Sequence, residues 1–222
     1  MFAINHTATA LVIKKYYPNV PMVWLLISVQ LIEILWITFH FAGIEHTSTE
    51  AVVSTISDIH MWHMPYSHSI ASSLLLAFLS WIVIDKVLGF RKAAIAISIG
   101  ILSHIALDVL THTQDIPLAP ALTTKIGLGL YDIPMAAFLV EIIYGIVCWR
   151  VFGGGKGLLA VIFIFNLANV SIFSTSINGL EMQMANQPIL IATSVAVQTI
   201  ISFILVWLLS RKRCLVLEQN AA

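Results

Sequence analysis

Charged residues and cysteines are scarce in this chain. Only 10% of its 222 residues are charged, whereas soluble domains average about 25%. Acidic and basic residues cancel to a formal net charge of zero, and no basic tract offers an electrostatic surface for nucleic acid. The two cysteines, Cys148 and Cys214, show neither metal-site nor disulfide spacing. The composition therefore argues against a soluble domain and against nucleic acid as a partner.

Long apolar runs dominate the sequence instead, because 59% of the residues are hydrophobic. A helix needs about 20 apolar residues to cross a hydrocarbon core of about 30 Å. Six stretches approach that length: residues 22–42, 66–88, 93–112, 131–151, 158–176 and 188–209. The linkers are short and no internal repeat is visible. We therefore expect an all-α, polytopic bundle of about six transmembrane helices, forming one integral membrane domain over residues 1–222 with the lipid bilayer as its surroundings.

Lysine and arginine are distributed unequally between the two predicted sides. Basic loops are retained in the cytoplasm. With the N-terminus inside, the external side holds only Lys125, and the cytoplasmic side holds Lys14, Lys15, Lys86, Arg91, Lys92, Arg150, Lys156, Arg211, Lys212 and Arg213. This asymmetry predicts a multi-pass protein of the cytoplasmic membrane with both termini in the cytoplasm.

The first sixteen residues do not have the order of a signal peptide, because Lys14 and Lys15 follow the apolar segment and His6 interrupts it. Two arrangements remain open. The segment could be a re-entrant half-helix that enters from the cytoplasmic side and carries His6 to a depth of ~12 Å. It could also be a surface amphipathic segment with an exposed His6.

The stretch from Ser103 to Asp115 carries two histidines and two acids at the end of an apolar run. On a helix, His104 and Asp108 lie one turn apart on one face, and His112 lies about one turn further along. Such a face can hold a metal ion, although the same groups could also only hydrogen-bond neighbouring helices. Ionisable groups are costly inside a membrane, which favours a functional role.

Two further polar residues fall at similar depths. Glu33 lies ~18 Å from the inner boundary, near the middle of the membrane, where a carboxylate is protonated, paired or bound to a cation. A structural hydrogen bond to Gln30, which shares its face, is the alternative. His68 follows Pro65, which suits the first turn of a helix. The positive end of the helix dipole would favour the neutral, metal-binding form of His68.

The second half of the chain looks mainly structural. All eight histidines lie at or before position 112, so we assign the site to residues 1–120 and expect residues 121–222 to be mainly scaffold helices. Glu141 lies ~14 Å deep and either supports the site from below or is a packing acid. Asn166 and Asn169 are expected to hydrogen-bond across helices.

Three motifs in order resemble a known family over about residues 1–120. They are His6 near the N-terminus, the run Tyr66-Ser67-His68-Ser69, and the run Ser103-His104-Ile105-Ala106-Leu107-Asp108. This order resembles bacterial inner-membrane metal-dependent hydrolases, some described as LexA-regulated. It is more remotely similar to zinc-dependent phospholipases C and related zinc nucleases, which are all-helical with a polynuclear zinc site.

The resemblance implies metal ligands at His6, His68, His104 and Asp108, with an acidic ligand between the first two. Many family members carry a Pro-Asp-x-Asp-His stretch there, and this chain does not. Either Glu33 or Asp58 could take that role.

Together these observations predict a hydrolase of the bacterial cytoplasmic (inner) membrane that depends on zinc or another divalent transition metal. Its site would lie in the outer half of the bilayer, and the remote resemblance implies a lipid-like or phosphoester substrate. The expected metal ligands are His6, His68, His104 and Asp108. Glu33 is a further ligand or the general base, and His112 and Asp115 orient ligands or carry protons.

Two other functions fit parts of the same pattern. Chains of His, Asp and Glu also serve as ion or proton pathways, so a metal-ion or proton transporter is an alternative. Against it, the cytoplasmic half offers only His6 and Glu141. A non-catalytic membrane assembly protein with an inactive site is the third interpretation, and metal content would separate it from the others.

Overall fold

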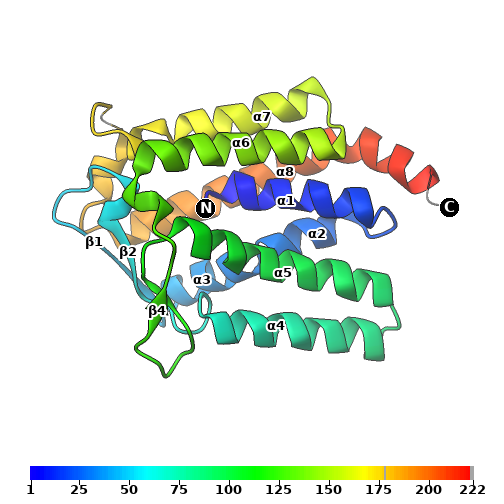
Figure 1. Ribbon diagram of the computed structural model, residues 1–222, viewed down its shortest axis with the longest axis horizontal. Helices are drawn as coiled ribbons and strands as arrows, with labels where there is room; N and C mark the ends of the chain where they lie inside the picture. The colour runs from blue at the N-terminus through cyan, green and yellow to red at the C-terminus, as the bar shows by residue number, and fades with distance from the viewer. Residues whose placement is uncertain (178, 221–222) are drawn as a thin grey trace.

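Helices make up most of the protein and run side by side along its long axis (Figure 1). The computed structural model describes residues 1–177 and 179–220. Within these residues eight α-helices occur: α1 (Ala3–Tyr16), α2 (Met22–Val29), α3 (Leu31–Phe41), α4 (Ile70–Ile82), α5 (Arg91–Thr111), α6 (Pro134–Phe152), α7 (Lys156–Ala168) and α8 (Pro188–Gln219). The prediction of a mostly helical protein is confirmed.

Four helical segments are long and apolar enough to cross a membrane. They are α5, α6, α8 and the segment Ile70–Val87, in which the π-helical turn Val83–Val87 extends α4. Helices α2 and α3 meet at an angle of 56° and give a fifth span if they are counted as one. A sixth span is not confirmed, because α7 has only 13 residues and reaches ~20 Å at 1.5 Å per residue.

The ends of α7 and α2 have local causes. Asn169 directly follows the last residue of α7. Its side chain donates to the Phe165 carbonyl at 2.7 Å, which satisfies a terminal carbonyl of the helix. Gln30 separates α2 from α3, and its buried amide donates to the Ala3 carbonyl at 2.7 Å. Gln30 therefore ties the bend to α1, rather than pairing with Glu33 as one sequence interpretation allowed.

Helix α1 lies inside the bundle, in contact with α2, α5, α6 and α8 (Figure 1). Every residue from Ala3 to Leu11 is buried, so the alternative of a surface amphipathic segment is wrong. Small residues such as Ala8 and Thr7 let the neighbouring helices approach closely. At the far end of α1, Lys14 is fully buried and pairs with Glu218 at 2.6 Å.

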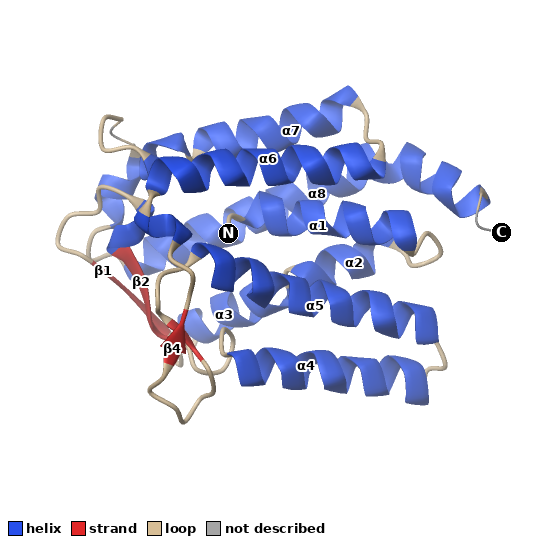
Figure 2. Cartoon of the chain, viewed as in Figure 1, coloured by secondary structure: helices blue, strands red, loops and turns tan. Residues whose placement is uncertain are grey.

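Short strands and turns gather at one end of the bundle (Figure 2). Strand β1 (His46–Thr49) pairs with β2 (Ile59–His63) in antiparallel register, and β3 (Ile116–Pro117) pairs with β4 (Lys125–Ile126). The 3-10 turns are η1 (Ile56–Asp58), η3 (Leu130–Asp132), η4 (Val170–Phe173) and η5 (Leu180–Met184). The opposite end holds the α4–α5 and α6–α7 connections and the C-terminus. The basic residues, apart from Lys125 on β4, fall in elements at that opposite end.

The core divides along the bundle. Toward the basic end, one apolar cluster joins α1, α2, α6, α7 and α8 through residues that include Leu11, Leu25, Phe152 and Leu158. Toward the strand end, a second cluster includes Ile32, Trp36, Ile101 and Ile191. Polar side chains of the first turns of α1 lie between them, and these residues lead to the candidate site.

The approach of α5 to α2 generates a first prediction. A Cβ added at Gly100 would overlap the Ser28 side chain and lie 3.3 Å from the Ser28 carbonyl carbon. Overpacking of this kind costs about 1–3 kcal/mol. We expect Gly100→Ala to lower the melting temperature of the detergent-solubilised protein by roughly 2–4 °C for each kcal/mol lost.

Gly155→Ala is the matched control, since nothing lies within 4 Å of a Cβ at that position. Its melting temperature should fall less than that of Gly100→Ala, because the expected cost is only that of replacing glycine by alanine at the N-cap of α7. Equal melting temperatures for the two variants would contradict the close approach of α5 and α2.

Candidate metal centre

Five side chains singled out in the sequence come together at one place inside the bundle. His6 comes from α1, Glu33 from α3, His68 from the turn before α4, and His104 and Asp108 from α5. Four of them are almost inaccessible, with exposed fractions of 1% for His6, 1% for His68, 0% for His104 and 2% for Asp108. The tertiary structure therefore brings the predicted ligand set together, and the ligand role itself stays a prediction.

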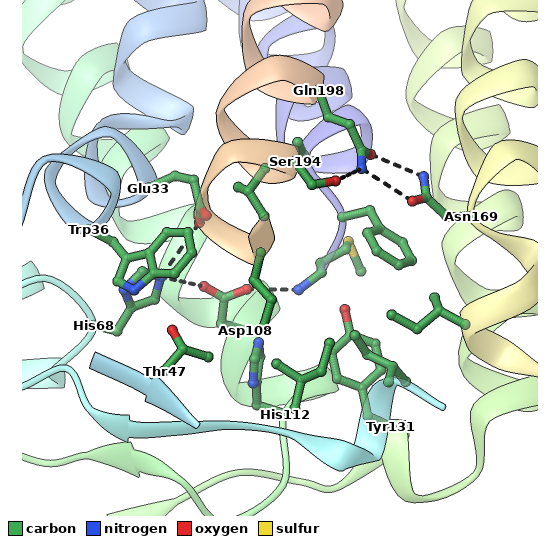
Figure 3. Close-up of a pocket in the computed structure, with 18 of the residues that line it drawn as sticks. Glu33, Trp36, Thr47, His68, Asp108, His112, Tyr131, Asn169, Ser194 and Gln198 are labelled. Carbon is green, nitrogen blue, oxygen red and sulfur yellow. Dashed lines mark hydrogen bonds and ion pairs between the residues drawn. The ribbon is translucent and has the colours of Figure 1, made fainter. Parts of the chain in front are cut away.

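Asp108 is the centre of the cluster (Figure 3). Its Oδ2 lies 3.1 Å from His104 Nε2 and 3.8 Å from His68 Nε2, and its Oδ1 lies 3.1 Å from His6 Nε2. The backbone nitrogen of Met1 approaches Oδ1 to 2.8 Å. One carboxylate is thus surrounded by three imidazoles that come from three different parts of the chain.

Glu33 completes a second group on the other side of His104. Its Oε2 lies 3.5 Å from His104 Nε2 and 3.6 Å from His68 Nε2. Ligand atoms held 2.0–2.2 Å from one zinc ion in a tetrahedron are about 3.3–3.6 Å apart. The two separations from Glu33 fall in that range, and those from Asp108, at 3.1–3.8 Å, lie on either side of it. Two overlapping triplets result: His6, His104 and Asp108, and Glu33, His68 and His104.

Hydrogen bonds orient two of the imidazoles. His104 Nδ1 lies 2.8 Å from the carbonyl of Val29, the last residue of α2. His68 Nδ1 lies 2.8 Å from Ser67 Oγ, which donates to Glu45 Oε2 at 2.5 Å. Since each acceptor calls for an Nδ1–H, each Nε2 keeps its lone pair. This is the arrangement by which proteins present histidine to a metal ion.

Several buried polar atoms of the cluster have no hydrogen-bond partner among the described residues. They are His6 Nδ1, His104 Nε2 and Asp108 Oδ2, the last two lying 3.1 Å apart without the geometry of a hydrogen bond. A buried polar atom without a partner costs about 1–3 kcal/mol. His104 Nε2 and Asp108 Oδ2 face each other, so one cation between them would satisfy both atoms. The donor set therefore fits a divalent metal.

The structure corrects where the helix after the strand-end loop begins. The sequence favoured Pro65 in its first turn, but α4 begins at Ile70. Ser69 is the N-cap, and its hydroxyl accepts the Ser72 N–H at 3.2 Å, as serine does at helix N-termini. His68 consequently lies in the turn just outside the helix, still close to its positive end.

The other predicted residues lie around the cluster. Helix α5 ends at Thr111, so His112 is extended rather than helical and reaches the same cavity. Its Nδ1 lies 3.5 Å from Asp115 Oδ1. Asp58 is elsewhere, because its carboxylate accepts the N–H groups of Ser54 and Thr55 at 2.8 Å each. Of the two acids considered for the missing motif, Glu33 is the one in the cluster.

Glu141 is fully buried beside the cluster and fixes the start of α1. It accepts hydrogen bonds from the Phe2 N–H at 3.2 Å, from the Asn5 side chain and from the Tyr131 hydroxyl at 3.1 Å. Burial, and next the neighbouring Glu141 carboxylate, hold the pKa of the Tyr131 phenol well above its usual value, so Tyr131 stays a donor. Glu141 thus positions the helix that carries His6, as one sequence interpretation allowed.

A cavity of about 160 Å³ adjoins the cluster. Glu33, His68 and Asp108 contribute to its wall, and Figure 3 shows these groups facing it together with His112 and Tyr131. Most of the remaining wall is apolar, and part of it comes from η4 and α8. Residues 121–222 therefore line the cavity in addition to supporting the bundle.

Sequence reasoning missed several groups that shape this site. Tyr131 and Glu45 had no recognisable spacing from the residues that they contact. Ser67 was part of the run around His68, but its contact with Glu45, 22 residues away, could not be read from the sequence. Trp36, whose ring meets the His68 ring edge-on at 6.4 Å, looked like any other lipid-facing aromatic residue. Only burial of Glu45, which is 0% exposed, distinguishes it from the solvated acids of the same loop.

Comparison with protein-family models, with curated proteins and with solved structures gives no match for this chain. The family resemblance therefore remains a prediction that depends on the motifs around His68 and His104. Function has to be argued from the geometry of the cluster.

The link from Ser67 to His68 generates a second prediction. Removing the Ser67 hydroxyl frees His68 to rotate and leaves its Nδ1 without an acceptor. Loss of such a supporting hydrogen bond weakens metal binding by about 10–100-fold. We expect this weakening of Zn²⁺ affinity in Ser67→Ala, measured by competition with a chromophoric chelator.

Ser103→Ala is the control, because Ser103 is adjacent to His104 but its hydroxyl donates to the Gly100 carbonyl at 2.7 Å. It should bind Zn²⁺ like the wild type. Equal affinities in Ser67→Ala and Ser103→Ala would show that the Ser67 contact does not orient a ligand.

Proposed function

We propose that this protein is a membrane-embedded hydrolase that depends on zinc or a similar divalent metal. The observation that carries the proposal is the pair of overlapping triplets around His104, with facing buried atoms that lack hydrogen-bond partners. In this proposal His6, His68, His104, Asp108 and Glu33 hold the metal. A bound divalent ion supplies a Lewis acid and an acidified water.

Charge supports a cation at this position. Glu33 and Asp108 are two carboxylates in an apolar bundle, and the histidines beside them are neutral ligands when they bind a metal. Burying carboxylates without compensation is strongly unfavourable. A divalent ion balances both, whereas the Met1 nitrogen contacts only one oxygen of Asp108.

The residues around the ligands have separate roles in the proposed reaction. The proposal takes Glu33 as a ligand, and support for this comes from its Oε2, which faces two histidines. His112 lines the cavity but belongs to neither triplet, and its Nδ1 lies 3.5 Å from Asp115, which orients the ring. His112 is therefore the group proposed to take a proton from the attacking water and return it to the leaving group. Tyr131, kept protonated, fixes the wall beside it.

The expected setting is the bacterial cytoplasmic membrane. Helices apolar enough to span a membrane support an integral membrane protein. We propose that the end rich in basic residues faces the cytoplasm, as the basic asymmetry favours. The strand end, the metal cluster and the cavity then belong to the outer half of the bilayer. A lipid-like or phosphoester substrate suits an apolar cavity at that depth.

Transport is the weaker alternative. A pathway would have to continue from the cluster to the basic end, and this region is filled mainly by the apolar cluster that includes Leu11, Leu25, Phe152 and Leu158. Buried polar groups there are paired with one another, as Thr7 is with Ser202 and Thr9 is with Tyr144. Packed apolar side chains present no chain of donors and acceptors for protons or ions. A site that opens on one cavity and is closed below fits hydrolysis better than passage.

Metal analysis tests the proposal most directly. We expect purified protein to retain zinc and to cleave bis(4-nitrophenyl) phosphate or 4-nitrophenyl butyrate in a chelator-sensitive manner. Asp108→Ala and His104→Ala should each lose metal and activity, and the double variant should lose little more, because ligands act as a unit. His112→Ala should keep the metal and react more slowly.

Metal content is measured by plasma mass spectrometry on the same preparations whose melting temperatures are recorded. Less than about half an equivalent of any transition metal in the wild type would contradict the proposal, since zinc at protein sites survives purification. Full occupancy in Asp108→Ala would remove this face of α5 from the site.

Orientation is tested with single cysteines in a variant that lacks Cys148 and Cys214. Thr123→Cys lies in the connection between β3 and β4, and Gly155→Cys lies just before α7. A membrane-impermeant maleimide should label Thr123→Cys in intact cells and Gly155→Cys only after permeabilisation. The reverse pattern would place the cluster in the inner half of the membrane.

A further inference from the structure

A second cavity, of about 420 Å³, lies beside the first. Its wall is formed by residues of α7 and α8 with η4 and η5. Five residues line both cavities: Asn169, Ile172, Met184, Ser194 and Gln198. These shared residues are therefore a thin partition between the candidate metal centre and a space between α7 and α8.

The second cavity reaches the outer apolar surface of the bundle. Ile164 lines it and is at the same time 62% exposed. Leu167, Val197 and Ile201, on the same two helices, are also exposed apolar residues. A helix surface of this kind contacts lipid chains in a membrane. The cavity consequently opens sideways, toward hydrocarbon.

The partition carries a pair of side-chain amides. Asn169 Nδ2 donates to Gln198 Oε1 at 3.0 Å, and Gln198 Nε2 donates to Asn169 Oδ1 at 3.3 Å and to Ser194 Oγ at 3.3 Å. Both bonds from Gln198 are longer than the 2.7–3.2 Å usual for N–H···O bonds. Figure 3 shows the three side chains at the edge of the cavity that Asp108 faces. Gln198 can therefore redirect its N–H groups to a ligand oxygen at little cost.

We propose that a glycerophospholipid enters the candidate metal centre sideways, between α7 and α8, and that Gln198 and Asn169 bind its ester oxygens. This inference rests on the proposed function, because it names the substrate class of the same site. The acyl chain lies along Phe165, Ala168 and Ile172, and the phosphate passes the amide partition toward Glu33 and Asp108.

The chemistry of the two cavity walls favours this occupant. Neither wall includes a lysine or an arginine, and the acid of the second wall, Glu181, accepts hydrogen bonds from Ser171 and from the Gly179 N–H. The positive groups within reach of a lipid phosphate are therefore the proposed metal ion and the Met1 nitrogen, which already pairs with Asp108. Neutral amides donate hydrogen bonds to ester carbonyls, which have no other donors in hydrocarbon. An acyl chain matches the apolar part of the wall.

Photolabelling tests the route without depending on catalysis. Zinc-loaded protein in phosphatidylethanolamine and phosphatidylglycerol nanodiscs is irradiated with a phosphatidylglycerol that carries a diazirine near the end of one acyl chain. Labelled peptides are then mapped by mass spectrometry. We expect labels on the cavity-lining residues Phe165, Ile172 and Met184.

Ala168→Trp should fill the second cavity and exclude the acyl chain. Labelling of these residues should fall by at least about fivefold, which corresponds to a loss of about 1 kcal/mol in binding free energy. Ala160→Trp is the matched control on α7, since Ala160 is exposed and does not line the cavity. Its labelling should equal that of the wild type. Melting temperatures of both variants show whether either has lost its fold.

Gln198→Leu provides an independent variant that removes the donors and keeps the volume. It should weaken displacement of the label by dihexanoyl phosphatidylcholine about fivefold, as expected for one lost hydrogen bond. Unchanged labelling in Ala168→Trp, or labels confined to outward-facing residues in the wild type, would overturn the proposed route.

The soluble ester probes separate this inference from the hydrolase proposal. If Ala168→Trp cleaves bis(4-nitrophenyl) phosphate like the wild type but loses lipid labelling, both proposals are supported. If the wild type cleaves the probes and the variant still labels fully, only the lateral route fails. If the wild type is labelled in the cavity but cleaves nothing, the hydrolase proposal fails and the lipid site stands.

Discussion

The burial of Asp108 is the constraint on which the rest of the structure depends. A carboxylate that is 2% exposed inside an apolar bundle needs charge compensation and hydrogen bonds, because hydrocarbon and packed side chains offer neither. The partners come from α1, α5 and the turn before α4, so each of these elements must reach the same point. The position of α1 in the centre of the bundle is explained by this requirement, since only there can His6 approach Asp108 to 3.1 Å.

The surroundings hold these partners by a set of buried polar contacts at both ends of α1. Near its start, Glu141 binds the Phe2 N–H and the Asn5 side chain, and Gln30 binds the Ala3 carbonyl. At its far end, Lys14 pairs with Glu218 of α8. Each contact leaves a costly unpaired group when its partner is removed. A helix fixed at both ends can present His6 with little freedom, and ligand geometry benefits from such rigidity.

Access to the site follows from the same architecture. Toward the basic end, tightly packed apolar residues close the bundle, and toward α7 and α8 two cavities are separated only by a shared partition. The shortness of α7 contributes, because the chain after Ala168 leaves the helix and continues as η4 along the cavity wall. The short length of α7 and the cavity between α7 and α8 therefore both follow from one local feature, the end of the helix at Asn169.

The sequence by itself indicated the membrane class, the helical architecture and four members of the cluster: His6, His68, His104 and Asp108. Apolar length and scarce charge are properties of composition, and the spacing of His104 and Asp108 follows from helix periodicity, so neither needs long-range information. Only the tertiary structure decided that Glu33 rather than Asp58 joins the histidines, that α1 lies inside the bundle, and that Glu45 and Ser67 orient His68. It also decided that α7 is short and that the second half of the chain lines the cavity. These features depend on contacts between segments as far apart as Asn5 and Asn166, and no local pattern encodes which distant polar groups will be buried against one another.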